Sequence, residues 1–147
     1  MKTYHFYGAT STSVKPINEA YSSIIDQRHL YDLLSTIWCK ETCAPRMQNN
    51  WSKENMTLGQ CSITAFLVQD IFGGLVYGVP LNDGNYHCFN VIGDVIFDLT
   101  SEQFRNIKLD YQNVFLQKRE THFASQEKYQ RYLLLKKLLN DEIKVHK

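Results

Sequence analysis

Cys61 stands in the stretch Leu58-Gly-Gln-Cys-Ser-Ile-Thr-Ala65, where an apolar run typical of a buried helix begins. The open N–H groups and the positive dipole at a helix start favour a thiolate. Cysteines placed there, especially beside a histidine, have pKa values of about 3.5–7.5 instead of about 8.5. Gly59 lets the backbone enter the helix and leaves room for a substrate, and the Cys61 N–H is then placed to bind an oxyanion. The pattern predicts a nucleophilic thiol.

His87 and Asp98 follow on two segments, residues 86–92 and 95–99, that are typical of strands and are joined by a tight Gly-Asp turn. If that turn is a two-residue hairpin loop, the two side chains share one face as diagonal neighbours, about 7–8 Å apart at Cα. A carboxylate there orients the imidazole and stabilises the imidazolium that forms when the thiol gives up its proton. We therefore predict a Cys61–His87–Asp98 triad, which a register slip of one residue would break.

Each of these residues also has an ordinary structural interpretation. A cysteine at a helix start can be a small buried hydrophobe, His87 can be a hydrogen-bonded interior histidine, and Asp98 can cap the turn that follows its strand. Their joint placement favours the triad. Cys88 is expected on the opposite strand face from His87, packed in the core.

A zinc site is an alternative use of the same side chains. Only one Cys-x3-Cys pair exists, whereas a zinc ribbon or finger uses two such pairs. The ligands would come from Cys39, Cys43, Cys61, His87 and Cys88.

Length and composition indicate a single domain over residues 1–147 that can bury a real core. Sixteen Lys and Arg against fifteen Asp and Glu give a net charge of +1, with both signs interleaved, so we expect no nucleic-acid partner. We find no secretory signal and no membrane-spanning run, so we expect a soluble, cytoplasmic protein without a membrane partner. The four cysteines are then expected to be free thiols.

Apolar periodicity predicts an α+β fold, in which a buried helix bearing the cysteine packs on a mostly antiparallel sheet bearing the histidine and the aspartate. Thr100 and Gln103 form a capping-box pattern for a short helix. The other expected elements are an irregular lead-in over 1–16, a helix from Asn18 to Trp38 capped by Asn18, a loop over 43–58, a helix ended by Gly73-Gly74, a β-meander over 75–79, 86–92 and 95–99, and a last helix over 125–144.

Several motifs between Trp51 and Phe104 resemble the YunG-like family of uncharacterised bacterial proteins. They are W-S-K-E-N, L-G-Q-C-S-I-T-A, V-Q-D-I-F-G-G, H-C-F-N and F-D-L-T-S-E-Q-F, and R-Y-L-L-L-K-K-L-L from Arg131 to Leu139 resembles the family's terminal helix. The resemblance implies a papain-like fold, related in plan to NlpC/P60 and transglutaminase-like proteins. It also implies Cys61 as nucleophile, His87 as general base and Asp98 as orienter. Met56 replaces an expected proline, and Cys88 an expected aromatic residue.

The papain-like plan implies an oxyanion glutamine several residues before the cysteine. Here Gln60 is directly adjacent, and Gln48 and Asn55 lie further back, so all three are candidates. Trp51 is a candidate for the cleft wall, or alternatively a core plug for the long loop.

The expected function is that of a cysteine hydrolase or acyltransferase that acts on a peptide or small amide substrate through a thioacyl intermediate. No organic cofactor is implied, because the sequence has no phosphate loop or dinucleotide fingerprint. A catalytically silent papain-like binding or structural protein is the alternative from another class, and a zinc-binding module is a further one.

Overall fold

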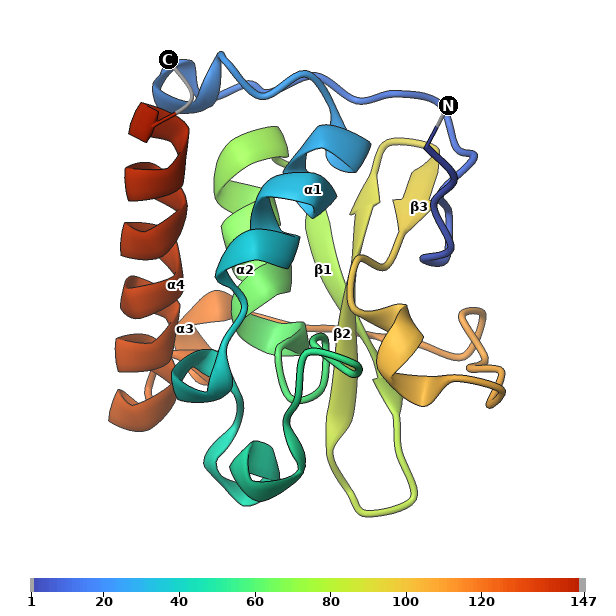
Figure 1. The fold of residues 1–147 in the computed structure, drawn as a ribbon. Coiled ribbons are helices and arrows are strands. Elements are labelled where there is room, and N and C mark those ends of the chain that lie inside the picture. The colour runs from blue at the N-terminus through green and yellow to red at the C-terminus, as the bar shows by residue number, and fades with distance from the viewer. Residues whose placement is uncertain (1, 146–147) are drawn as a thin grey trace.

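A four-stranded antiparallel sheet and a set of helices make up residues 2–145, which the computed structural model describes (Figure 1). The strand order is β3-β2-β1-β4, and every neighbouring pair is antiparallel. The predicted α+β class is therefore confirmed. The α-helices are α1 (Gln27–Ile37), α2 (Cys61–Phe72), α3 (Arg119–His122) and α4 (Gln126–Val145), the 3-10 helices are η1 (Glu19–Tyr21), η2 (Lys40–Thr42), η3 (Pro45–Asn50) and η4 (Ser101–Phe104), and the strands are β1 (Leu75–Pro80), β2 (Tyr86–Ile92), β3 (Val95–Phe97) and β4 (Phe115–Leu116).

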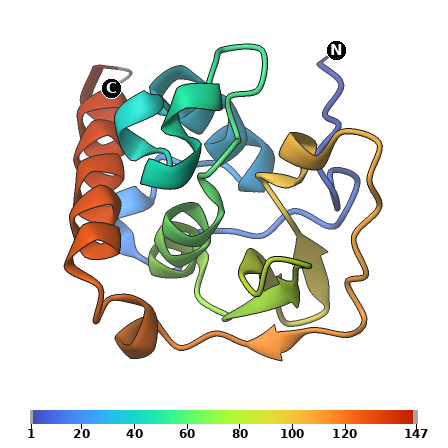
Figure 2. The ribbon, with the colours of Figure 1, turned by 90° about the horizontal axis from the view of Figure 1, so that it is seen from below.

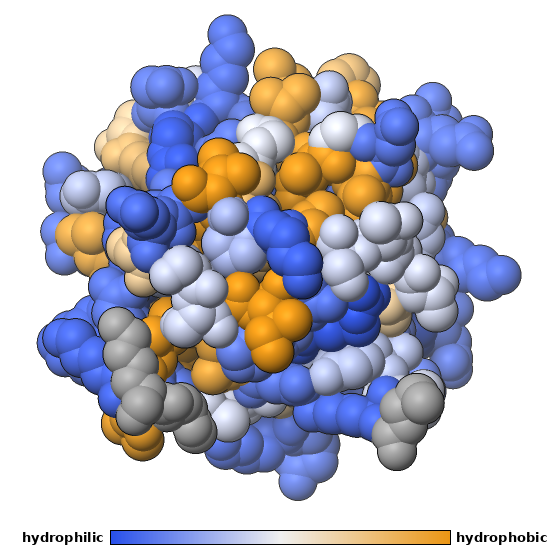
Figure 3. All heavy atoms as spheres, turned by 90° about the horizontal axis from the view of Figure 1, so that it is seen from above, coloured by the Kyte–Doolittle hydropathy of each residue, from blue (hydrophilic) through white to orange (hydrophobic). Residues whose placement is uncertain are grey.

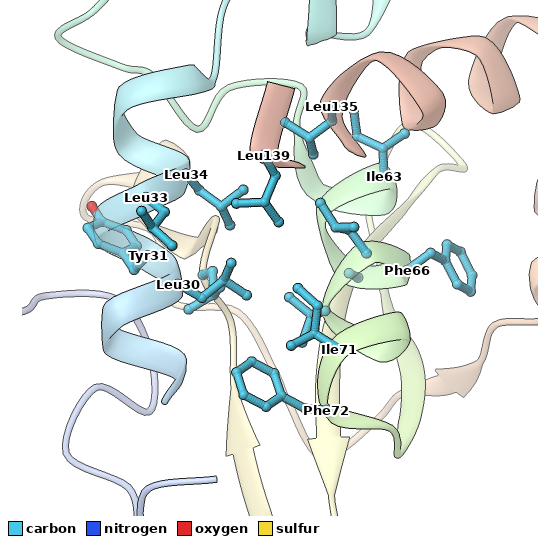
Figure 4. Packing of buried hydrophobic residues seen from close by; sticks show 14 of the residues in the cluster. Leu30, Tyr31, Leu33, Leu34, Ile63, Phe66, Ile71, Phe72, Leu135 and Leu139 are labelled. Carbon is cyan, nitrogen blue, oxygen red and sulfur yellow. The ribbon is translucent and has the colours of Figure 1, made fainter. Parts of the chain in front are cut away.

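Helix α2 is the central element, and it lies between α4 and the sheet in both ribbon views (Figures 1 and 2). Its apolar residues face in all directions, and eight of its twelve residues are buried, as expected for a helix enclosed by protein. Gly73 ends it at φ 80°, a left-handed conformation that suits glycine. Figure 4 shows Leu34 of α1, Ile71 of α2 and Leu139 of α4 pointing into one shared core.

The predicted helix from Asn18 to Trp38 is wrong in its first half. Asn18 does cap, but it caps only the short 3-10 turn η1. A new helix starts after Asp26, whose side chain accepts the N–H groups of Arg28 and His29. Apolar residues on both sides of the break are buried, so the periodicity continued through a non-helical link.

The predicted β-meander is confirmed, and so is its hairpin register, since Ile92 pairs with Val95. Strand β3 is shorter than expected and ends at Phe97. Asp98 makes an isolated bridge with Tyr7 of the N-terminal lead-in, whose carbonyl accepts the Asp98 N–H at 2.9 Å. The backbone of Asp98 is thereby fixed from the outer side of β3.

The connections depart from the sequence-based expectation in three places. Residues 101–104 do form a short helix, but the Thr100 side chain does not cap it, because its hydroxyl bonds to Asp98 instead. The long loop contains η3 at its centre. The chain after η4 passes outside the sheet, as Figure 2 shows, and adds β4 to its edge before α3. The last helix is confirmed.

The surface carries both polar and apolar side chains. The face in Figure 3 shows patches of hydrophobic residues set among hydrophilic ones. Within residues 2–145, no helix is both long and apolar enough to cross a membrane.

Candidate active site

Cys61 is the first residue of α2, and its thiol is half-buried. The residue before the helix, Gln60, offers no side-chain cap within the described chain. The N–H groups of the first helical turn are therefore open to another acceptor. Gly59 has φ +70°, and a Cβ at this position would lie 2.5 Å from the Cys43 sulfur. Glycine is thus required for the turn that brings Cys61 to the helix start.

His87 and Asp98 form a buried pair. Nε2 of His87 lies 2.6 Å from Oδ2 of Asp98, and both side chains are 1% exposed. The same carboxylate oxygen accepts the Tyr111 hydroxyl at 2.7 Å. The other oxygen accepts the N–H of Thr100 at 3.2 Å and its hydroxyl at 3.3 Å. The carboxylate is therefore held on both oxygens and cannot turn away from the ring.

The imidazole of His87 is favoured in its charged form. Burial alone would lower its pKa, but the negative charges of Asp98 and then Cys61 outweigh burial and raise the pKa to about 10. The edge of the ring packs against Phe104 at 4.6 Å between centroids. Within the described residues Nδ1 is buried and has no hydrogen-bond partner, which leaves it available to the Cys61 thiol.

The thiol of Cys61 is favoured as thiolate. Its pKa is held well below the usual value by hydrogen bonding from the Cys88 thiol, followed by the charge of His87 and a hydrogen bond from that ring, while burial opposes them. The same contact and burial raise the pKa of Cys88. Cys88 is buried in the core, as expected, but it also touches the reactive sulfur, which strand alternation did not predict.

A pocket of about 600 Å³ opens over these groups, which we call the Cys61 pocket. It brings Cys61, His87 and Cys88 to one surface. A substrate of moderate size can therefore reach the sulfur. The other polar or charged side chains of its wall include Arg46, Ser62, Asn85, Gln103, Gln117, His122, Glu127, Lys128 and Arg131.

The four other cleft candidates lie outside the wall of this pocket as the described residues form it. The Gln60 amide is fully buried and donates to the Cys39 carbonyl at 3.0 Å. Gln48 and Trp51 likewise donate to backbone carbonyls, those of Cys43 at 3.1 Å and Met56 at 2.9 Å, and Asn55 forms a bridge with Ser52. These side chains shape the long loop, and the glutamines that reach the pocket wall are Gln103 and Gln117.

Sequence reasoning missed Tyr111 as a partner of Asp98, whereas the Thr100 contact is the turn cap that it offered as the ordinary role of Asp98. Tyr111 lies on an irregular segment with no periodic pattern, and it stacks on Tyr7 at 3.8 Å between ring centroids. No local signal could have placed it. Thr100 follows Asp98 by two residues, and the Asp-x-Thr spacing of an Asx turn was a usable signal for that contact.

The cysteines do not gather into a metal site. Among residues 2–145, no group of three or more His, Cys, Asp or Glu is placed to hold a metal ion. All four cysteines are free thiols. The Cys61 thiol instead lies 4.0 Å from the Tyr86 carbonyl oxygen, on the wall of the candidate site.

Comparison with known sequences gives one consistent result. A family model described as "YunG protein" matches residues 26–144. A protein of Bacillus subtilis (strain 168), described as "Uncharacterized protein YunG", is 31% identical over 103 residues, which is 69% of this chain and 84% of the relative. No solved structure matches the chain significantly. The matched segments include Cys61, His87 and Asp98 within the family model's range.

Proposed function

The chain belongs to the YunG protein family, and we propose that it is a papain-like cysteine hydrolase or acyltransferase with Cys61 as nucleophile. Its substrate is a peptide or a small molecule with an amide or related acyl bond. His87 is the acid–base group, and Asp98 orients it and stabilises its charge.

One observation carries this proposal: a buried carboxylate holds the His87 ring through Nε2, its Nδ1 has no hydrogen-bond partner among the described residues, and Cys61 lies on the same pocket wall. A merely structural histidine does not require a cysteine whose thiolate form is favoured. A merely structural cysteine at this position does not require an imidazole held by a fixed carboxylate. Together they form the nucleophile, base and orienter arrangement that acyl transfer uses.

In the first half-reaction the Cys61 thiolate attacks the acyl carbon, and the carbonyl oxygen becomes an oxyanion. The imidazolium of His87 donates its proton to the leaving amine, the carbon–nitrogen bond breaks, and a thioester to Cys61 remains. In the second half-reaction neutral His87 takes a proton from water or an acceptor amine, which attacks the thioester and releases the Cys61 thiolate. Hydrolysis and acyl transfer differ only in this acceptor.

The open amides at the start of α2 supply the oxyanion donor in this mechanism. Gln60 provides no side-chain cap among the described residues, so the backbone N–H of Cys61 is free to bind the developing charge. The dipole of a twelve-residue helix adds to the stabilisation at the same point.

Iodoacetamide labelling followed by mass spectrometry tests the proposal. Wild-type Cys61 should be labelled rapidly at pH 6, and His87→Ala should slow this labelling at least about tenfold, since one pKa unit changes the thiolate fraction tenfold below the pKa. Cys39→Ser is the matched control, because Cys39 interacts with Thr42 and lies outside the pocket wall.

Acyl probes then test the chemistry itself. Peptide, amide and ester probes should leave an acyl mass on Cys61 that disappears in Cys61→Ala. The enzyme proposal would be overturned if Cys61 were labelled slowly, at a rate that increases with pH toward 9 and is the same in His87→Ala. That result would favour a catalytically silent binding protein.

A further inference from the structure

Lys128 brings a positive charge to the wall of the Cys61 pocket. It lies in the first turn of α4, its side chain is partly buried, and it lines the pocket together with Cys61 and His87. Among residues 2–145 its ammonium group has no ion-pair or hydrogen-bond partner. A lysine without a counter-charge on a pocket wall is placed to pair with an anionic ligand.

The other cations of the wall have partners. Arg131 pairs with Glu127 and also donates to the Thr42 carbonyl at 3.0 Å. Arg46 pairs with Asp83 at 3.3 Å.

His122 adds no charge to this wall, because burial, followed by the repulsion of Lys128, lowers its pKa to about 4. Glu127 is the single acidic residue of the described pocket wall, and it forms an ion pair with Arg131. Among the Lys, Arg and Glu side chains of the described pocket wall, Lys128 is therefore the one without an ion-pair partner.

Lys128 also lies within electrostatic range of two side chains beside the reacting sulfur. Its charge acts on Cys88 and on His122, and both of these side chains interact with Cys61. A substrate bound to Cys61 displaces water from the pocket and increases the strength of any charge interaction there. A neutral substrate would leave the ammonium without a partner, whereas an anionic one would neutralise it.

We infer that the Cys61 pocket takes an acyl substrate that carries a carboxylate, and that Lys128 selects it. This inference rests on the proposed function and names the substrate class of the same site. Lys128 is a specificity residue, since it does not enter the proton transfers or the bond-making steps.

Two alkylating agents of nearly equal shape provide the test, because iodoacetate carries a carboxylate where iodoacetamide carries a neutral amide. With both, the Cys61 sulfur displaces iodide from the same carbon. In wild type the ratio of the iodoacetate rate to the iodoacetamide rate should exceed that of a small free thiol measured under the same conditions. High salt should lower the ratio.

Lys128→Gln should slow the alkylation of Cys61 by iodoacetate on the order of fivefold, which is the effect of one partly screened charge. It should change the rate of alkylation by iodoacetamide less than about twofold. Lys128→Arg should restore the ratio. Lys137→Gln is the matched control, because it removes the same charge from an exposed position of the same helix, where Lys137 pairs with Asp141.

A wild-type ratio equal to that of the free thiol and insensitive to salt would overturn the inference, and so would equal effects of Lys128→Gln and Lys137→Gln. The first of these readouts needs no variant, so it holds even if Lys128→Gln does not fold. Failure of the proposed function would give a different result, namely slow iodoacetamide labelling of Cys61 at the same rate in wild type and in His87→Ala.

Discussion

His87 and Asp98 meet through Nε2 and Oδ2 at 2.6 Å, with both side chains 1% exposed. At this depth an ionised carboxylate requires partners, and Asp98 has them in His87, Tyr111 and Thr100. The network fixes the imidazole with Nε2 toward the carboxylate. The ring can therefore face Cys61 only with its other edge.

Asp98→Asn should weaken the nucleophile without removing the hydrogen-bonding side chain. The Asp98 charge is the largest factor that raises the pKa of His87, so its loss lowers that pKa and destabilises the imidazolium beside Cys61. We expect iodoacetamide labelling of Cys61 at pH 6 to slow at least about tenfold. Tyr111→Phe keeps the carboxylate charge and should have a much smaller effect; equal rates in wild type and Asp98→Asn would contradict the proposed role.

The Cys61–His87 pair predicts an unusual dependence of stability on pH. The pKa of His87 is raised from 6.5 to about 10, so its contribution is complete below pH 6.5 and is lost as pH increases through about 10. The pKa of Cys61 is lowered from 9.0, so its contribution is present above pH 9 and is lost as pH falls through the lowered value. Between pH 6.5 and 9 folded and unfolded forms bind the same number of protons at this pair.

Urea unfolding across pH should therefore show no contribution of the pair to the slope between about pH 6.5 and 9, and a decline on either side. Cys61→Ser removes one of the two opposing effects. Its free energy of unfolding should decrease between about pH 6.5 and 9 by up to about 1.4 kcal/mol per unit, a range in which the pair contributes no slope in wild type. Parallel pH curves for wild type and Cys61→Ser would show that the two groups do not share a proton.

Periodicity and turn chemistry predicted the elements that carry Cys61 and His87 and the strand that ends just before Asp98. The apolar run of α2 and the two-residue turn before Val95 gave the helix start and the hairpin register that the structure has. These features are local, so they can be found in one sequence. The assignment of catalytic roles to these residues stays a prediction.

Contacts between distant segments could not be predicted in the same way. Helical spacing continues across the break before Asp26, because buried residues on both sides face one core. Tyr111 reaches Asp98 from an irregular segment, and Cys88 touches Cys61 although its neighbour His87 does too. Such contacts depend on tertiary packing, and no periodicity or residue spacing in a single sequence indicates which distant segments meet.

Cys88→Ala should shift the acid limb of Cys61 labelling. The Cys88 thiol makes the largest contribution to the lowered pKa of Cys61, so its removal should increase that pKa and move the midpoint of the iodoacetamide pH–rate profile upward. Cys88→Ser keeps a donor and should give an intermediate profile. Cys39→Ser should leave the midpoint unchanged; a midpoint unmoved by Cys88→Ala would show that the sulfur contact has no influence on the thiolate.

Gly59→Ala should destabilise the fold at the approach to Cys61. The new Cβ would lie 2.5 Å from the Cys43 sulfur and 2.9 Å from the Ala44 nitrogen, in a backbone with φ +70°. The strain alone costs about 1–3 kcal/mol, and the clash adds to it. Gly84→Ala is the matched control, since Gly84 has φ +86° with open space around it and isolates the backbone cost. Urea unfolding should show a clearly larger loss for Gly59→Ala; equal losses would mean that the loop around Cys43 moves aside without cost.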